Sequence, residues 1–197
     1  MIEKDGLKMY FADLHLHSRF SRACSSQLNI ENLEKWARVK GLDILGTGDF
    51  THPVWLQELK DNLTEKEGIF YSVGGFAFVL SGEISLMYTQ GRGRRVHLVL
   101  LAPSFEVVDK INSWLDTKGR RDYDGRPIFK ISCEDFVAKM AEIDDRIECI
   151  PAHCLLGDTV IHTNYSLKKI KDIKEGDVIY THKKKWQKVK AVLKRPY

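Results

Sequence analysis

Residues 150–159 read Ile-Pro-Ala-His-Cys-Leu-Leu-Gly-Asp-Thr, and the character of the chain changes inside this stretch. Before it, strand-like and helix-like patterns alternate, with turn residues between them. After it, short β-type runs follow one another without an amphipathic helix between them. The sequence therefore predicts two folding units of different class, residues 1–153 and residues 154–197.

The basic charge of the chain belongs to its second part. Residues 1–153 carry 20 Lys and Arg against 23 Asp and Glu, a net charge of −3, and residues 154–197 carry 11 against 4, a net charge of +7. The overall +4 is therefore weak evidence that the first part binds nucleic acid. The charged N-terminus does not resemble a signal peptide, and no apolar run is long enough to span a bilayer. We expect a cytoplasmic protein with reduced thiols and no membrane partner.

The first 153 residues predict a mixed α/β fold. Helices are expected after Asn29, Ser104 and Ser132, which are good N-cap residues, and from Pro53, which suits a first helical turn. Repeated β–α units of this kind favour a parallel sheet in the form of a barrel. A turn is expected at residues 91–95. The runs with strand-like composition are residues 10–17, 42–47, 76–88, 96–102 and 148–151.

Residues 118–127 are rich in Gly, Asp and Pro and are expected to form a loop. One interpretation is an ordinary solvated surface loop. The other is a contact with a phosphate backbone, because Arg side chains pair with phosphates and Tyr stacks on bases.

Side chains that can bind metal recur near the ends of the expected strands. His15 and His17 stand two residues apart, so they point to one face of a strand while Leu16 points to the other. Each such residue alone could be a core histidine, an edge charge or a helix cap. Their recurrence favours a metal centre, since ligands gather at the C-terminal strand ends of parallel barrels. The candidate ligands are His15, His17, Asp49, Glu83, His97 and His153.

A mixed set of imidazoles and carboxylates suits Zn²⁺, Mn²⁺ or Fe²⁺ better than Ca²⁺ or Mg²⁺. Two or more such ions can deprotonate a water molecule and hold the oxygens of a phosphate for in-line attack. The residue types therefore favour phosphoester hydrolysis.

The motif Asp-Leu-His-Leu-His-Ser at residues 13–18, with Asp49, Glu83, His97 and Pro-Ala-His at 151–153, resembles the PHP (polymerase and histidinol phosphatase) superfamily. The resemblance implies a distorted (β/α)₇ barrel, incomplete here, with up to three divalent metals, Zn²⁺ or Mn²⁺ and also Mg²⁺. Residues 17–23 and 46–53 more narrowly resemble archaeal endonuclease Q, whose members nick DNA beside deaminated bases and at abasic sites. A metal-dependent DNA repair nuclease is therefore implied over residues 10–153. A histidinol phosphatase-like small-molecule phosphatase is the alternative.

The chain departs from the PHP pattern at three places. Many members carry Asp where this chain has Ser21-Arg22, so an early ligand is absent. The spacing from Asp49 to His52 leaves open whether one or both bind metal. The late Asp-x-His motif does not occur before residue 154. A site without these ligands is expected to bind metal poorly.

The segment from Cys154 to Thr159, with β runs at residues 159–163, 178–182 and 189–193, resembles the first splicing block of an intein, a Hint fold. By that resemblance Cys154 is a catalytic nucleophile that attacks the carbonyl of His153 and forms a thioester. The intein's Thr-x-x-His block and its terminal His-Asn are not found, so splicing would need C-terminal intein and extein segments as partners. The resemblance implies a nuclease that is inactive until spliced, or a chain whose main activity is protein splicing.

Overall fold

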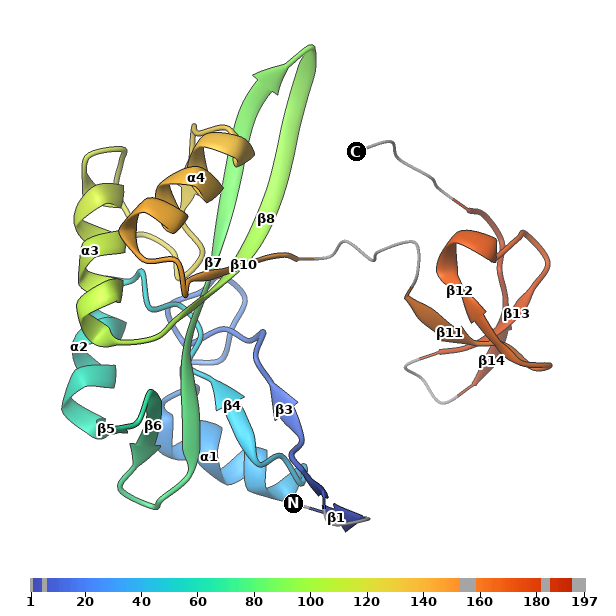
Figure 1. The fold of residues 1–197 in the computed structure, drawn as a ribbon, viewed down its shortest axis with the longest axis horizontal. Coiled ribbons are helices and arrows are strands. Elements are labelled where there is room, and N and C mark those ends of the chain that lie inside the picture. Colours follow the sequence, from blue (N-terminus) through green and yellow to red (C-terminus); the bar gives the residue numbers. More distant parts are fainter. Residues whose placement is uncertain (1, 5–6, 153–158, 182–184, 193–197) are drawn as a thin grey trace. The chain divides into compact units, whose positions relative to one another are not determined.

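The computed structural model describes residues 2–4, 7–152, 159–181 and 185–192. The chain divides into two units, Met1–Ala152 and His153–Tyr197. The first is a mixed α/β unit with a sheet-rich core, and the described part of the second contains short strands and one 3₁₀ turn (Figure 1). The assignment of the first unit to a PHP-type domain and of the second to a Hint domain stays a prediction.

One eight-stranded sheet organises the first unit, along the path β10–β8–β7–β4–β3. β3, β4 and β7 are parallel, whereas β8 is antiparallel to both β7 and β10. The sheet is thus only partly parallel, because the chain turns back at Gly91 without a crossover helix. Closure into a barrel stays a prediction. The strands are β3 (Ala12–Asp13), β4 (Ile44–Gly46), β5 (Leu63–Lys66), β6 (Ile69–Ser72), β7 (Ala77–Gln90), β8 (Arg92–Ala102), β9 (Ile128–Phe129) and β10 (Glu148–Pro151), and a separate ribbon comprises β1 (Ile2–Lys4) and β2 (Leu7–Met9).

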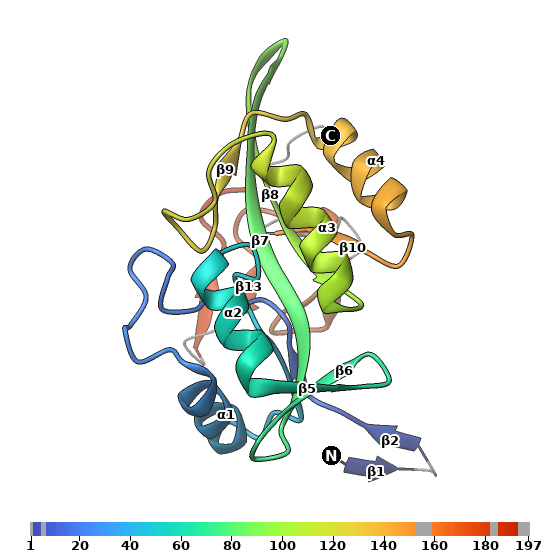
Figure 2. The ribbon, with the colours of Figure 1, turned by 90° about the vertical axis from the view of Figure 1, so that its left-hand side faces the viewer.

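Each helix begins where the sequence predicts it, because a side chain caps its first turn. Asn29, Ser104 and Ser132 accept hydrogen bonds from backbone amides three residues later. α2, α3 and α4 lie on one side of the long strand β7, over a core of Leu, Ile and Phe side chains (Figure 2). No described helix is long and apolar enough to cross a membrane. The helices are α1 (Ile30–Val39), α2 (Pro53–Asn62), α3 (Phe105–Asp116) and α4 (Cys133–Ile143).

The strand boundaries differ from the sequence prediction in ways that matter for the site. The run at 10–17 contains only β3, so the segment with His15 and His17 follows a strand rather than ending one. The expected turn at 91–95 narrows to Gly91, which has a positive φ of 69°, because cross-strand pairing continues to Gln90 and Arg92. Glu83 and His97 therefore lie inside long strands and not at strand ends.

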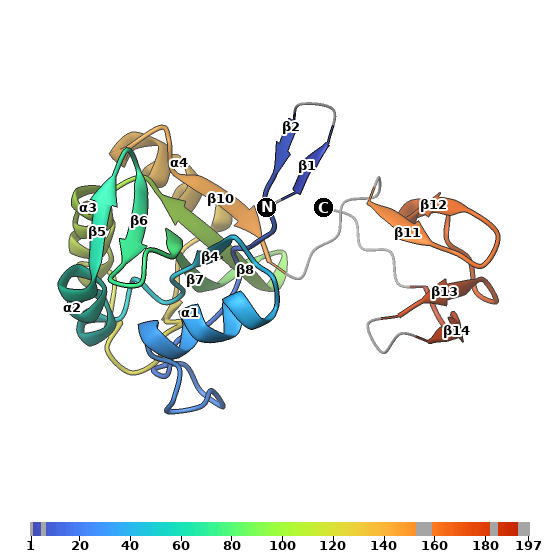
Figure 3. The ribbon, with the colours of Figure 1, turned by 90° about the horizontal axis from the view of Figure 1, so that it is seen from below.

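The described part of the second unit consists of two antiparallel ribbons joined by a bridge between Thr163 and Ile179 (Figure 3). The third run was expected at 189–193, but the last strand among the described residues is β14, and residues 189–192 are not in a strand. The Trp186 ring lies 5.0 Å from that of Tyr180, which favours this register. The elements are β11 (Val160–His162), β12 (Leu167–Lys169), the 3₁₀ turn η1 (Ile170–Asp172), β13 (Val178–Tyr180) and β14 (Trp186–Lys188).

Candidate metal centre

Three histidines meet around the buried carboxylate of Glu83. Oε2 of Glu83 lies 2.9 Å from Nε2 of His15 and 3.0 Å from Nε2 of His17. Oε1 lies 2.7 Å from Nδ1 of His97, which comes from the neighbouring strand β8. The structure thus brings together four residues that the sequence proposed as ligands.

The approach of the two N-terminal histidines depends on a glycine. Gly48, two residues after the end of β4, has a φ of 66°, and a Cβ at this position would lie 2.7 Å from the carbonyl oxygen of Leu16. The side chain of Leu16 packs against the core. His15 and His17 on either side of it both reach Glu83, as the alternation of their side chains predicts, although they do not lie in a strand.

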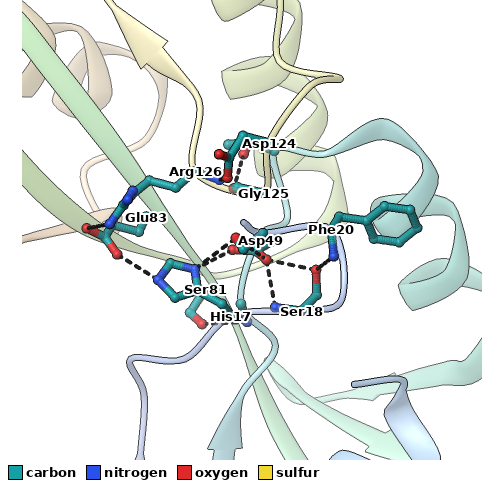
Figure 4. Close-up of polar contacts among 12 residues, drawn as sticks. His17, Ser18, Phe20, Asp49, Ser81, Glu83, Asp124, Gly125 and Arg126 are labelled. Carbon is teal, nitrogen blue, oxygen red and sulfur yellow. Dashed lines mark hydrogen bonds and ion pairs between the residues drawn. The ribbon is translucent and has the colours of Figure 1, made fainter. Parts of the chain in front are cut away.

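Asp49 forms a second buried cluster behind His17 (Figure 4). Its Oδ2 accepts hydrogen bonds from the backbone N–H of Ser18 at 2.6 Å and from the hydroxyls of Ser18 and Ser21 at 2.7 and 2.9 Å. Its Oδ1 lies 2.9 Å from Nδ1 of His17. Asp49 also has a positive φ of 49°, a backbone conformation that non-glycine residues seldom adopt. Asp49 is thus held in contact with His17, and its role as a metal ligand stays a prediction.

His52 has a different environment from Asp49. Its Nδ1 accepts a hydrogen bond from the backbone N–H of Trp55 at the start of α2, and its ring stacks on Phe20 at 4.2 Å. Burial lowers the pKa of His52. These contacts use the imidazole as a neutral helix cap.

The carboxylates set the charge of the histidine between them. The pKa of His17 is raised to about 9, first by its hydrogen bond to Asp49 and next by that to Glu83. Burial alone would raise the pKa of Glu83, but its contacts with His17 and His15 outweigh burial and lower it. Without a metal ion, His17 is therefore a cation held between two anions near neutral pH.

Residues 118–127, which the sequence left between two interpretations, lie partly against this site. A Cβ at Gly125 would collide with the carboxylate of Asp49 and the hydroxyl of Ser21, so only glycine fits this contact. The next residue, Arg126, places Nη1 3.6 Å from Oε1 of Glu83 (Figure 4). The end of the loop therefore belongs to the site rather than to an ordinary solvated surface.

The arginines in the middle of the same loop pair with acids within or beside it. Arg120 pairs with Asp122 at 3.0 Å and Arg121 with Asp116 at 2.7 Å. A pocket of about 470 Å³ opens here, away from Glu83. Because its cations are already paired, this pocket gives no reason to expect an anion. It is lined by Pro53, Asp116, Gly119, Arg120, Arg121 and Asp122.

Two residues proposed from the sequence, His153 and Cys154, lie outside the described residues. The sequence interpretation also missed three contributors, Ser18, Ser21 and Arg126. Ser21 had been noted only as the residue that replaces an expected Asp, and Arg126 only as one of several loop cations.

The residues present fit a divalent metal. One ligand atom from each of His15, His17 and Glu83 lies within 4.8 Å of the others, which is the separation expected around a shared ion. Imidazole and carboxylate donors suit Zn²⁺ and Mn²⁺. The hydrogen bond from His17 to Asp49 is the outer partner that metal-binding histidines usually have.

This chain is similar in structure to DNA-cleaving enzymes that act on lesions. It matches the lesion-specific endonuclease PfuEndoQ from Pyrococcus furiosus with a TM-score of 0.63 and 31% identity, over 73% of this chain and 34% of that one. A structure of endonuclease Q with a 27-mer duplex substrate carrying an abasic lesion at the active site matches with a TM-score of 0.64 and 30% identity, over 76% and 35% of the two chains. The structural neighbours are thus endonuclease Q.

A sequence match extends further along the chain. An uncharacterized protein of Methanocaldococcus jannaschii is 36% identical over 186 residues, which are 94% of this chain and 21% of the relative. This match is longer than the first unit and so runs into the second. The chain spans about a fifth of that relative and about a third of the endonuclease Q chains. No protein-family model matches the chain.

Proposed function

We propose that the first unit is the N-terminal part of a metal-dependent DNA repair nuclease that hydrolyses a phosphodiester bond at a deaminated base or an abasic site. The observation that carries the proposal is the convergence of His15, His17 and His97 on Glu83 within a fold similar to endonuclease Q. The parallel with a neighbour bound to DNA with an abasic lesion supports damaged duplex DNA as the substrate.

In this proposal His15, His17, Glu83 and His97 hold Zn²⁺ or Mn²⁺, with His153 as a further ligand. A bound ion would supply a Lewis acid and a hydroxide near neutral pH. The contact between Asp49 and Nδ1 of His17 fixes the tautomer that leaves Nε2 for the metal. The ion requires a neutral imidazole, so its binding displaces the proton that His17 otherwise holds.

Among the cations that the structure describes, Arg126 is the best placed to bind the substrate phosphate. Its guanidinium lies beside Glu83, and its side chain is 37% exposed, so it borders the cluster and still faces solvent. A guanidinium matches the geometry of phosphate oxygens through paired hydrogen bonds. Arg126 would hold the scissile phosphate against the metal ligands.

The test uses the full-length gene product with Mn²⁺ or Zn²⁺ and duplexes containing uracil, hypoxanthine or an abasic site. We expect nicking beside the lesion and no nicking of undamaged duplex. We also expect no hydrolysis of histidinol phosphate, which a small-molecule phosphatase would hydrolyse. If only the small phosphate ester is hydrolysed, the phosphatase alternative replaces the nuclease.

For the second unit, we propose that residues 154–197 begin an intein that interrupts the nuclease at its metal site. The thiolate of Cys154 would attack the carbonyl carbon of His153. A C–S bond forms, the C–N bond breaks, and the α-amino group of Cys154 takes up the proton that the thiol released. The interrupted chain separates His153 from later ligands and would be inactive until spliced.

The relative supports an interruption. Its length, inferred from the shared fraction, is about twice that of the endonuclease Q chains, so it has room for a large inserted element. Its similarity also crosses the boundary between the two units, and the described strands of the second unit form only antiparallel ribbons.

The splicing proposal is tested on the full-length gene product with Cys154→Ala, and with Cys133→Ala on α4 as the matched control. We expect the first variant to remain a single unspliced polypeptide without nicking activity, and the control to splice as the parent does. A Cys154→Ala protein that yields the shortened product on a gel would rule the proposal out.

A further inference from the structure

β7 and β8 form a hairpin that continues past the rest of the first unit. Their pairing runs without interruption from Leu80 opposite Ala102 to Gln90 opposite Arg92. Of the other described strands, β9 pairs with β7 only at Ser85 and Leu86, and β10 pairs with β8 only at residues 98–101. Residues 87–95, here called the ribbon tip, extend beyond α4 (Figures 1 and 2).

The ribbon tip is strongly basic. It carries Arg92, Arg94 and Arg95, and no Asp or Glu occurs between Glu83 and Glu106. Within the part of the chain that the structure describes, none of the three arginines has an ion pair, in contrast to the paired arginines of the 118–127 loop. Such a concentration of unpaired cations on a projecting element favours binding of an anionic partner from outside the unit.

The direction of the ribbon links this charge to the candidate metal centre. Arg95 stands two residues before His97 on β8, so it points to the same face of the hairpin as His97. Arg92 and Arg94 point to the opposite face. At about 3.4 Å per residue, Arg95 lies about 7 Å and Arg92 about 17 Å along the strand from His97.

We propose that the ribbon tip binds the sugar–phosphate backbone of duplex DNA on one side of the scissile bond. This inference rests on the proposed nuclease function and adds a second contact to it. Successive phosphates of one strand are about 3.4 Å apart along the helix axis, so Arg95 would reach about the second phosphate from the metal site, and Arg92, on the opposite face, would lie about five phosphate steps away and face the other strand. A two-stranded ribbon fits the major groove, where arginines on its two faces meet both strands.

The first experiment measures how DNA binding depends on salt. The 197-residue chain is compared with R92Q/R94Q/R95Q and with K35Q/K40Q/K66Q, which removes three exposed lysines from α1, its C-terminal end and β5. All three proteins keep the basic second unit, so its contribution is common to them. We expect the slope of log K against log salt to fall by about 2 to 3 in the arginine variant, with at least a tenfold loss of affinity at about 0.1 M salt, and little change in the lysine variant.

Arg94 is half-buried, so a second variant, R92Q/R95Q, changes only the exposed positions and protects against misfolding. Its slope is expected to fall by about 2. An unchanged slope in both arginine variants, or an equal fall in the lysine variant, would overturn the proposal.

A second experiment locates the contact. Single methylphosphonate linkages, which remove one phosphate charge, are placed at successive positions on each side of an abasic site. Substitution about two to five positions away on one side should weaken binding of the parent chain severalfold and leave R92Q/R95Q unaffected. Equal effects on parent and variant at every position would contradict the ribbon contact. The salt dependence of binding can also be measured on undamaged duplex, without any cleavage. Failure of the nuclease proposal would instead be seen as absence of nicking by the full-length product, so the two failures are distinguishable.

Discussion

Two buried carboxylates, Glu83 and Asp49, contact the same imidazole from opposite sides and have different surroundings. Glu83 is surrounded by histidine nitrogens and lies near the guanidinium of Arg126. Asp49 is surrounded by one backbone amide and two hydroxyls in addition to His17. Imidazole neighbours are themselves metal ligands, whereas serine hydroxyls satisfy a carboxylate by hydrogen bonds. The partners of a buried acid, and not its burial, therefore separate a candidate ligand from a positioning group.

The largest expected effect is that of Glu83→Gln. This change keeps the size of the side chain but removes the charge shared by three histidines, so we expect loss of bound metal and a fall in nicking of about a thousandfold or more. Metal content by mass spectrometry and nicking of an abasic duplex by the full-length product provide the measurement. Glu65→Gln, at an exposed position of β5, is the matched control and should retain both.

Asp49→Asn should act more weakly, because it changes the partner of His17 and not a ligand. We expect stoichiometric metal binding with affinity about 10- to 100-fold lower, measured by calorimetric titration with Zn²⁺. Loss of metal binding as complete as in Glu83→Gln would contradict this difference between the two acids and would indicate that Asp49 is itself a ligand.

The pH dependence of metal binding tests the position of His17 between the two acids. The raised pKa of about 9 means that the metal-free protein holds this proton at pH 7. Protonated His17 stabilises the metal-free fold below its ordinary pKa of about 6.5, and this contribution is lost as the pH rises through about 9. Metal affinity should therefore increase up to about tenfold per pH unit between pH 7 and 9. Zn²⁺ titrations in buffers of different ionisation enthalpy should show release of about one proton near pH 7, and no release at that pH would contradict the assignment.

The smallest effect is expected for Ser21→Ala, which removes one of the hydroxyls that hold Asp49. The free energy of unfolding should fall by about 1 to 2 kcal/mol, because a buried carboxylate loses one of several hydrogen bonds. Denaturant unfolding checks this value, with Ser26→Ala at an exposed position as the control. A loss no greater than that of the control would mean that Ser18 alone is sufficient to hold Asp49.

Local patterns predicted much of the first unit. The spacing of His15 and His17 placed both on one site, and the capping residues fixed the helix starts at Asn29, Ser104 and Ser132. These features depend on residues a few positions apart, where backbone geometry alone decides which side chains meet. Glu83 was recognisable because a charge inside an apolar run requires a partner.

The features that escaped prediction depend on contacts distant in sequence. The hydrogen bonds that Asp49 accepts from Ser18 and Ser21 join residues about thirty positions apart, and serines at those positions look like any loop residues. Arg126 could not be separated from the two neighbouring arginines until the structure showed that Arg120 and Arg121 have acidic partners within or beside the loop. The long hairpin of β7 and β8 was likewise not predicted, because its only sequence signal is a Gly-Arg stretch that also fits an ordinary turn.

The sheet of the first unit has a consequence for how the protein must be handled after synthesis. Among the described residues, its terminal strands β3 and β10 each pair with one neighbouring strand and have no strand partner on the other side. Tyr10 and Phe11 beside one edge and Ile150 on the other are exposed. Such edges are sites where a second copy can add a strand, so the risk of aggregation grows with protein concentration and with the time that both edges stay open. Slow expression at low concentration should therefore increase the yield of soluble protein.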